Sequence, residues 1–262
     1  MRIKIIMLFG LVIILQNQIT SQTLKIDYHK IDFREYDGGK NTINPTELYL
    51  SAKESYFLED QVIDGRTTNV PIDAYNKGNY LGAKIAGDSK GKIIIKDLTK
   101  NQFLQRKNSV NHKEFPYRKV TDSILPKFDW KLINENKTIL GYSAQKAETT
   151  HNDRKITAWF SSQLAFSDGP WKFHGLPGLI LEVKIEFEPM QYMVYEAIKI
   201  SPTAAFPQIP EITDPEEQLS QIEREYYNKA KNNFKYFRTI SKGQLKLRLD
   251  DLDFKPILFE TN

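Results

Sequence analysis

A chain of 262 residues, with 40% hydrophobic and 12% aromatic residues, can bury one substantial core. Its formal net charge is +4, and this near balance of acids and bases argues against a nucleic-acid-binding protein. The sequence contains no cysteine, which excludes disulfides, a thiol nucleophile and a cysteine-linked lipid anchor.

The first 21 residues predict a secretory signal peptide. A short basic start at residues 1–4 precedes an apolar run at 5–15, which is shorter than the roughly 20 residues that a membrane helix needs. Ser21 is the small residue expected just before the cleavage site. We therefore expect residues 22–262 to be exported, to the periplasm or out of the cell, as a single β-rich domain without a membrane span.

Apolar and polar residues alternate along much of the chain, as in half-buried strands. Strands are predicted at 24–33, 47–51, 54–58, 92–96, 102–104, 128–132, 138–149, 155–160, 179–187 and 192–200, and residues 245–249 are expected to form a final short strand or an ordered tail. A polar turn is expected at 134–137, a bulge at Gly141, and a long surface loop at 64–91. Short strands joined by short turns predict a mainly β (α+β) fold, a meander-like curved antiparallel sheet or half-barrel.

One amphipathic helix is predicted at 214–237. Asp214 is a favourable N-cap, Pro215 suits the first helical position, and Glu217 lies three residues after the cap. Apolar residues then recur at spacings of three and four, at Leu219, Ile222, Tyr226, Ala230, Phe234 and Phe237. We expect this apolar face to pack on the sheet.

Glycine and proline bracket two aromatic residues in the stretch 167–183, around which the rest of the chain is expected to be organised. Leu176-Pro177-Gly178-Leu179 has the residues of a type II turn, so the chain should reverse there and enter a strand. The predicted structural turn comprises Gly169, Pro170, Gly175, Leu176, Pro177 and Gly178.

Several ordered motifs occupy the middle third of the chain. They are Asp122-Ser123-Ile124-Leu125-Pro126-Lys127-Phe128-Asp129-Trp130, Ile139-Leu140-Gly141-Tyr142, Thr157-Ala158-Trp159-Phe160, Gly169-Pro170-Trp171-Lys172-Phe173 and Gly175-Leu176-Pro177-Gly178-Leu179-Ile180. Together they resemble the GLPGLI family of exported bacterial proteins. The resemblance implies export and a shared fold, and it implies no activity because the family has no defined biochemical function.

The turn region also contains the candidate functional residues. Ser167, Asp168 and His174 could form a hydrolase site, although they lack the strained Gly-x-Ser-x-Gly context that exposes a nucleophile. Hydrogen bonding of Ser167 and Asp168 to nearby backbone is the simpler interpretation. Trp171, Phe173 and His174 are the candidate ligand- or partner-binding residues, because an aromatic residue in a turn can line an apolar groove.

Two functions follow from these patterns. The first is an exported, non-catalytic protein of the cell envelope that binds an apolar ligand or an envelope protein. The alternative is a hydrolase that uses Asp168 and His174. Neither interpretation requires a cofactor or a metal, since the four histidines lack the spacing of metal ligands.

Overall fold

The computed structural model describes residues 23–34, 40–59, 62–63, 66–67, 88–108, 117–151, 154–188, 191–203 and 206–218. The predicted signal peptide, the expected strand or tail at 245–249 and most of the predicted loop at 64–91 lie outside these residues. All regular elements in the described part of the chain are strands.

Twelve strands form one sheet, and a short hairpin stands apart from it. The strands of the large sheet are β1 Thr23–Arg34, β2 Lys40–Leu50, β3 Glu54–Glu59, β6 Lys92–Asp97, β7 Gln102–Asn108, β8 Tyr117–Ile124, β9 Lys131–Ile139, β10 Tyr142–His151, β11 Arg154–Ser161, β12 Leu179–Glu188, β13 Gln191–Thr203 and β14 Glu216–Gln218. The hairpin consists of β4 Val62–Ile63 and β5 Arg66–Thr67.

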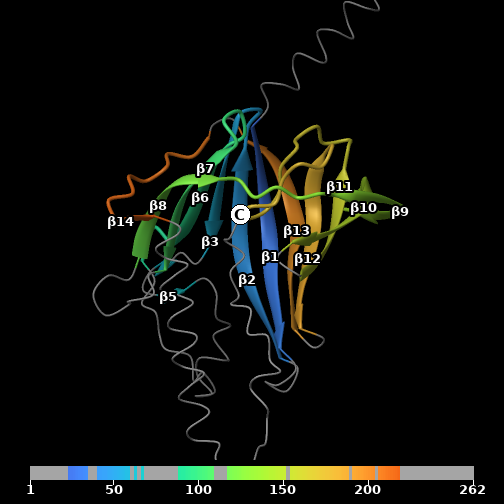
Figure 1. The fold of residues 1–262 in the computed structure, drawn as a ribbon, viewed down its shortest axis with the longest axis horizontal. Coiled ribbons are helices and arrows are strands. Elements are labelled where there is room, and N and C mark those ends of the chain that lie inside the picture. The colour runs from blue at the N-terminus through green and yellow to red at the C-terminus, as the bar shows by residue number, and fades with distance from the viewer. Residues whose placement is uncertain are drawn as a thin grey trace, which may run out of the picture.

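Two meanders share this sheet. The strand order is β14-β8-β7-β6-β3-β2-β1-β13-β12-β11-β10-β9, so the chain first moves outward from β1 to β8 and then returns from β9 to β13, which pairs with β1. Eleven of the twelve strands are joined by antiparallel pairings, and the short β14 alone is parallel to its neighbour β8. The predicted antiparallel meander is therefore confirmed (Figure 1).

The sheet must be strongly curled, because a short segment joins strands near its two ends. Only residues 125–130 lie between the end of β8 and the start of β9, and this stretch reaches about 24 Å at most. In a flat sheet, ten strand spacings would separate β8 from β9 by about 48 Å. In Figure 1 the segment runs from the green strands across the middle of the sheet to the olive β9.

The main core lies on the concave face of the curled sheet. Its buried side chains come from strands as distant as β7 and β10, which can share one cluster only if the sheet curls around it. The cluster contains Leu24, Ile26, Tyr28, Leu48, Leu50, Phe57, Ile94, Phe103, Leu125, Ala144, Ala147, Ile156, Ala158, Phe160, Phe173, Leu176, Leu179, Ile180, Leu181, Val183, Ile185, Tyr195 and Ala197. Residues 173–180 thus bring the stretch before β12 into the core.

The chain after β13 forms a strap, residues 206–218, across the opposite face of the sheet. Phe206, Ile209 and Ile212 pack against a second cluster of Tyr56, Leu58 and Ile93. Arg106 on β7 fixes the end of the strap, since its guanidinium donates to Asp214 at 2.6 Å and to Asp88 at 3.0 Å. Figure 1 shows the orange strap running to β14 at the green edge.

The predicted start of the C-terminal helix is wrong. Residues 216–218 form β14, which pairs with Lys119–Thr121 of β8. Asp214, the expected N-cap, accepts hydrogen bonds from Arg106 instead, and Glu216 accepts from Thr121. These tertiary partners outweigh the local capping signals. The remainder of the predicted helix, residues 219–237, lies outside the described residues.

The predicted turn at 134–137 is also wrong. Those residues lie within the edge strand β9, and the chain reverses at Leu140 and Gly141, with φ of 50° and 84°. Gly141 is therefore a turn residue and not a bulge in one long strand. Positive φ at both central positions is the geometry of a two-residue hairpin turn.

Candidate functional site

Residues 162–178, here called the corner loop, connect β11 to β12 and fold onto the concave face of the sheet. Asp168 and His174 face each other as an antiparallel bridge, and the Gly175 amide donates to the Ser167 carbonyl at 3.3 Å. The Ile180 amide donates to the Asp168 carbonyl at 2.9 Å. The corner loop is therefore a small folded unit tied to the first residues of β12.

The reversal at Leu176–Leu179 is tighter than a type II turn. The Gly178 amide donates to the Leu176 carbonyl at 2.8 Å, which closes a three-residue γ-turn centred on Pro177. Glycine is required at 178 by a close approach, because a Cβ atom there would lie 2.2 Å from the carbonyl oxygen of Ser161. The strand expected after the turn does begin at Leu179.

A buried ion pair anchors the corner loop to β6. The Lys96 ammonium donates to the Asp168 carboxylate and to the Gly169 carbonyl at 2.8 Å, and both charged side chains are at most 1% exposed. The Gly169 amide also donates to Asp168 Oδ1 at 2.7 Å, while Oδ2 has no partner among the described residues. Burial lowers the pKa of Lys96, and the charge of Asp168 opposes this effect.

Trp171 and Lys172 form the tip of the corner loop. Trp171 is half-buried and has φ of 52°, which is rare for a bulky residue. Lys172 is 1% exposed, and its ammonium lies 4.5 Å from the ring centre of Phe103 and 5.2 Å from that of Trp171. The buried Lys172 ammonium therefore makes cation–π contacts with both rings.

The segment between β8 and β9 packs on the corner loop through an aromatic cluster. The Phe128 ring centre lies 5.3 Å from that of Phe173 and 6.0 Å from that of His174. The Trp130 indole donates to the His174 carbonyl at 2.9 Å. Phe173 is fully buried in this cluster, so its side chain supports the loop from inside.

His174 is half-buried, and its imidazole has one defined hydrogen-bond partner. Its Nε2 is 3.0 Å from the Pro126 carbonyl oxygen, which can only accept, so Nε2 carries the hydrogen. Burial and then the nearby charge of Lys96 lower the pKa of His174 from 6.5. The imidazole is therefore uncharged at neutral pH, and Nδ1 keeps an acceptor lone pair.

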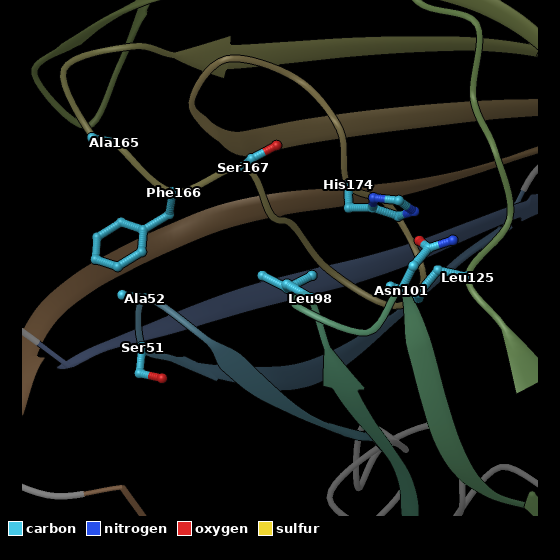
Figure 2. A pocket seen from close by; sticks show the side chains of 9 residues that line it. All are labelled: Ser51, Ala52, Leu98, Asn101, Leu125, Ala165, Phe166, Ser167 and His174. Atoms are coloured by element: carbon cyan, nitrogen blue, oxygen red, sulfur yellow. The ribbon is translucent and has the colours of Figure 1, made fainter. Parts of the chain in front are cut away.

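A pocket of about 350 Å³, here called the mouth pocket, lies where His174 meets the turns at one end of the sheet. Its walls come from the β2–β3 turn, the β6–β7 turn, the residue after β8 and the corner loop. The lining residues are Ser51, Ala52, Leu98, Asn101, Leu125, Ala165, Phe166, Ser167 and His174 (Figure 2). His174 thus lines the pocket, whereas Trp171 and Phe173 are not among its lining residues.

The three candidate hydrolase residues do not form a catalytic relay. Asp168 is buried and bonded to Lys96 and to its own loop, while Ser167 is exposed. The His174 Nε2 is bonded to a backbone carbonyl. No group of three or more His, Asp or Glu side chains in the described part of the chain could hold a metal ion.

Sequence reasoning missed the partner of Asp168 and most of the pocket lining. Lys96 ends a predicted strand and shares a face with Ile94, which places a lysine on the buried side. That periodicity could have identified Lys96 as a buried charge. Asn101 and Ser51 lie in turns far apart in sequence, and no local pattern relates them to His174.

Comparison with known proteins links the chain to one family model. Residues 148–182 match a family described as "Protein of unknown function (Porph_ging)". The match covers less than half of the chain and spans β11, the corner loop and the start of β12. No curated protein matches the chain.

Among solved structures, PNGF-II in its C2 crystal form has a TM-score of 0.52 and 20% sequence identity, covering 78% of this chain and 32% of that one. Its P21 crystal form gives 0.50 and 19%, covering 79% and 33%. The chain therefore spans about a third of the length of PNGF-II, and the likeness shows a shared fold alone.

Two more distant likenesses have TM-scores below 0.5 and bring no argument about this chain. MucB in complex with MucA(peri) scores 0.35 at 9% identity, covering 74% of this chain and 56% of that one. The LolA superfamily protein NE2245 from Nitrosomonas europaea scores 0.31 at 9% identity, covering 72% and 88%. Separately, no helix in the described ranges is long and apolar enough to cross a bilayer.

Proposed function

We propose that the chain is an exported, non-catalytic binding protein of the cell envelope, and that its ligand, or a projecting group of an envelope partner, binds in the mouth pocket. One observation carries this proposal. The described concave face is filled by the protein's own side chains, and the mouth pocket is an open, preformed cavity beside it.

The filled interior argues against carriage of an acyl chain along the concave face. Phe173, Leu176 and Leu179 of the corner loop and its junction are at most 1% exposed. The Tyr28 hydroxyl, from the middle of the sheet, donates to the Ile180 carbonyl at 2.8 Å and ties this junction to β1. A lipid chain would have to displace these contacts, so we favour binding at the rim.

The mouth pocket has the rigidity expected of a binding site. The Ser51 amide donates to the Glu54 carbonyl at 2.9 Å, and the Leu125 amide donates to the Asn101 carbonyl at 3.1 Å. The corner loop is fixed by its own bridge and by the Lys96–Asp168 pair. Because all walls are held in place, a ligand would bind with little ordering cost.

The alternative hydrolase is not favoured by the geometry. The Asp168 carboxylate pairs with Lys96, 72 positions away in sequence, and the His174 Nε2 bonds the Pro126 carbonyl, so the two side chains do not form the acid–histidine pair of a catalytic triad. Export, envelope location and the domain bounds 22–262 rest on the signal-peptide pattern of residues 1–21. The proposed membership of the GLPGLI family rests on the motifs between residues 122 and 180, of which those at 157–160 and 169–180 lie within the matched residues 148–182.

Native mass spectrometry of the mature protein, isolated from the envelope fraction of cells that produce it, tests this proposal. We expect a bound mass in the wild type and its loss in Ala52→Trp, because Ala52 lines the pocket and an indole would fill it. The matched control is Asn136→Trp on the exposed edge strand β9, which should retain the bound mass. A bare wild type, or a mass retained in Ala52→Trp, would contradict the proposal.

A further inference from the structure

We infer that the mouth pocket takes an uncharged saccharide, a ligand with hydroxyl groups around its rim and C–H groups on its faces. This inference rests on the proposed function, because it names the chemical class of the ligand in the same pocket. It is carried by the combination of neutral polar groups and apolar walls in the lining.

Among the described residues that line the pocket, none carries a carboxylate, ammonium or guanidinium group. Its polar members are Ser51, Asn101, Ser167 and His174, and the Lys96 charge nearby is already paired with Asp168. A charged ligand would lose hydration here without meeting an opposite charge, which is unfavourable. The lining therefore selects for a neutral ligand.

His174 supplies a hydrogen-bond acceptor of defined position. Its Nε2–H is committed to the Pro126 carbonyl, so Nδ1 remains to accept from a donor. Asn101 complements it with a carboxamide that both donates and accepts. Asn101 has φ of 56°, and its carbonyl holds Leu125, so its backbone is fixed at the β6–β7 turn. Adjacent hydroxyls, each able to donate and accept, match this pair.

The apolar part of the lining suits the C–H faces of a sugar ring. Phe166 is half-buried, and Leu98 and Leu125 provide aliphatic surface. In Figure 2 the Phe166 ring stands apart from His174 and Asn101, with Leu98 between them. A pocket of about 350 Å³ is at the small end of the range for ligand sites and has room for one or two sugar rings.

A peptide fits this pocket less well. Extended peptides usually bind by adding a strand to a free sheet edge. The mouth pocket is bounded by two turns, the residue after β8 and the corner loop, while the edge strands of the sheet are β9 and the short β14. A peptide backbone entering the pocket would therefore lack a ladder of partners, whereas a saccharide needs only the scattered polar groups that are present.

Saturation-transfer NMR on the mature protein tests the inference. The neutral probes are glucose, galactose, mannose and N-acetylglucosamine, and the charged probes are glucuronic acid and glucosamine, all at the same millimolar concentration. We expect at least one neutral sugar to receive saturation and both charged sugars to receive none. Binding of the charged sugars as tightly as the neutral ones, or binding of none of the neutral probes, would overturn the inference.

A matched pair of variants locates the sugar. Asn101→Asp keeps the shape and tolerates positive φ, but it removes a donor and adds a charge, so the Kd should rise about tenfold or more. Asn134→Asp makes the same change on the exposed strand β9 and should leave the Kd unchanged. Equal effects of the two variants would overturn the inference. If Asn101→Asp fails to fold, Ser167→Ala at an exposed position provides the same comparison.

The two proposals fail in different ways. A non-saccharide mass that is bound in the wild type and lost in Ala52→Trp would overturn the saccharide and leave the mouth pocket as the binding site. Absence of any bound mass together with absence of sugar binding would overturn both.

Discussion

The buried Lys96–Asp168 pair predicts a large loss of stability when one partner is removed. In Asp168→Asn, Lys96 would remain 0% exposed and would lose the charged partner that it has among the described residues, keeping only the Gly169 carbonyl. Removing one partner of a buried ion pair typically costs about 3–5 kcal/mol. The lysine could instead lose its proton. From its ordinary pKa of 10.5 to pH 7, that costs about 5 kcal/mol at roughly 1.4 kcal/mol per pKa unit.

Both routes predict that the free energy of unfolding falls by about 3–5 kcal/mol at pH 7, which is a large part of the stability of an ordinary domain. The sign of the pH dependence follows. In Asp168→Asn the folded protein binds fewer protons than the unfolded chain, because burial lowers the pKa of Lys96. The loss relative to wild type should therefore shrink as the pH rises, to about 1 kcal/mol near pH 10.

Urea denaturation of the mature protein, followed by circular dichroism at pH 7 and pH 10, measures these values. The double variant Lys96→Met with Asp168→Asn removes the buried charge and should recover most of the stability, and it remains informative if the single variant does not fold. A loss below about 1 kcal/mol at pH 7, or a double variant no more stable than the single one, would refute the reasoning.

The same structure makes further predictions at two glycines, at His174 and at Glu59. Gly178→Ala should cost more than about 3 kcal/mol, because its Cβ would lie 2.2 Å from a backbone oxygen. Gly141→Ala should cost only about 1–2 kcal/mol, because φ is +84° but a Cβ there would meet nothing within 4 Å. Equal melting temperatures of the Gly178→Ala and Gly141→Ala variants would contradict the close approach of Gly178 to Ser161. The free energy of unfolding of the wild type should fall as the pH decreases from about 7 to 5, because His174 binds a proton more readily in the unfolded chain than in the folded protein. Urea denaturation at several pH values should show a smaller fall for His174→Gln. Glu59→Gln, in a buried cluster with two lysines, should cost about 3 kcal/mol, whereas exposed Glu135→Gln should change the melting temperature little; similar losses would oppose this assignment.

The sheet was predictable wherever one face of a strand is buried. In β1, Leu24, Ile26 and Tyr28 point into the core while the residues between them are more exposed, so the period of two is clear in the sequence. The edge strand β9 has almost no buried side chains, so its polar residues resembled a turn. The actual reversal at Leu140 was hidden because leucine rarely adopts positive φ.

The start of the predicted helix shows how a tertiary contact can override local signals. Asp214, Pro215 and Glu217 match the preferences of a helix N-terminus. Arg106 lies 108 positions earlier in the chain and binds Asp214, and β8 pairs with the following residues. Local patterns contain no information about such partners.

The site was predictable only in part. Glycine and proline at 169–178 identified the corner loop, and His174 within it lines the mouth pocket. The other walls come from Ser51, Ala52, Leu98, Asn101 and Leu125, which meet the corner loop only because the sheet is curled and β13 returns to β1. The pocket is thus a product of topology, which alternation along single strands does not specify.

The most direct measurement is a map of backbone amide shifts in isotope-labelled mature protein on addition of the ligand recovered from the envelope fraction. The account predicts that the largest shifts fall at residues 51–52, 98–101 and 165–174, and that Ala52→Trp abolishes them. Large shifts confined to the edge strand β9 or to the strap, with none around His174, would contradict binding in the mouth pocket.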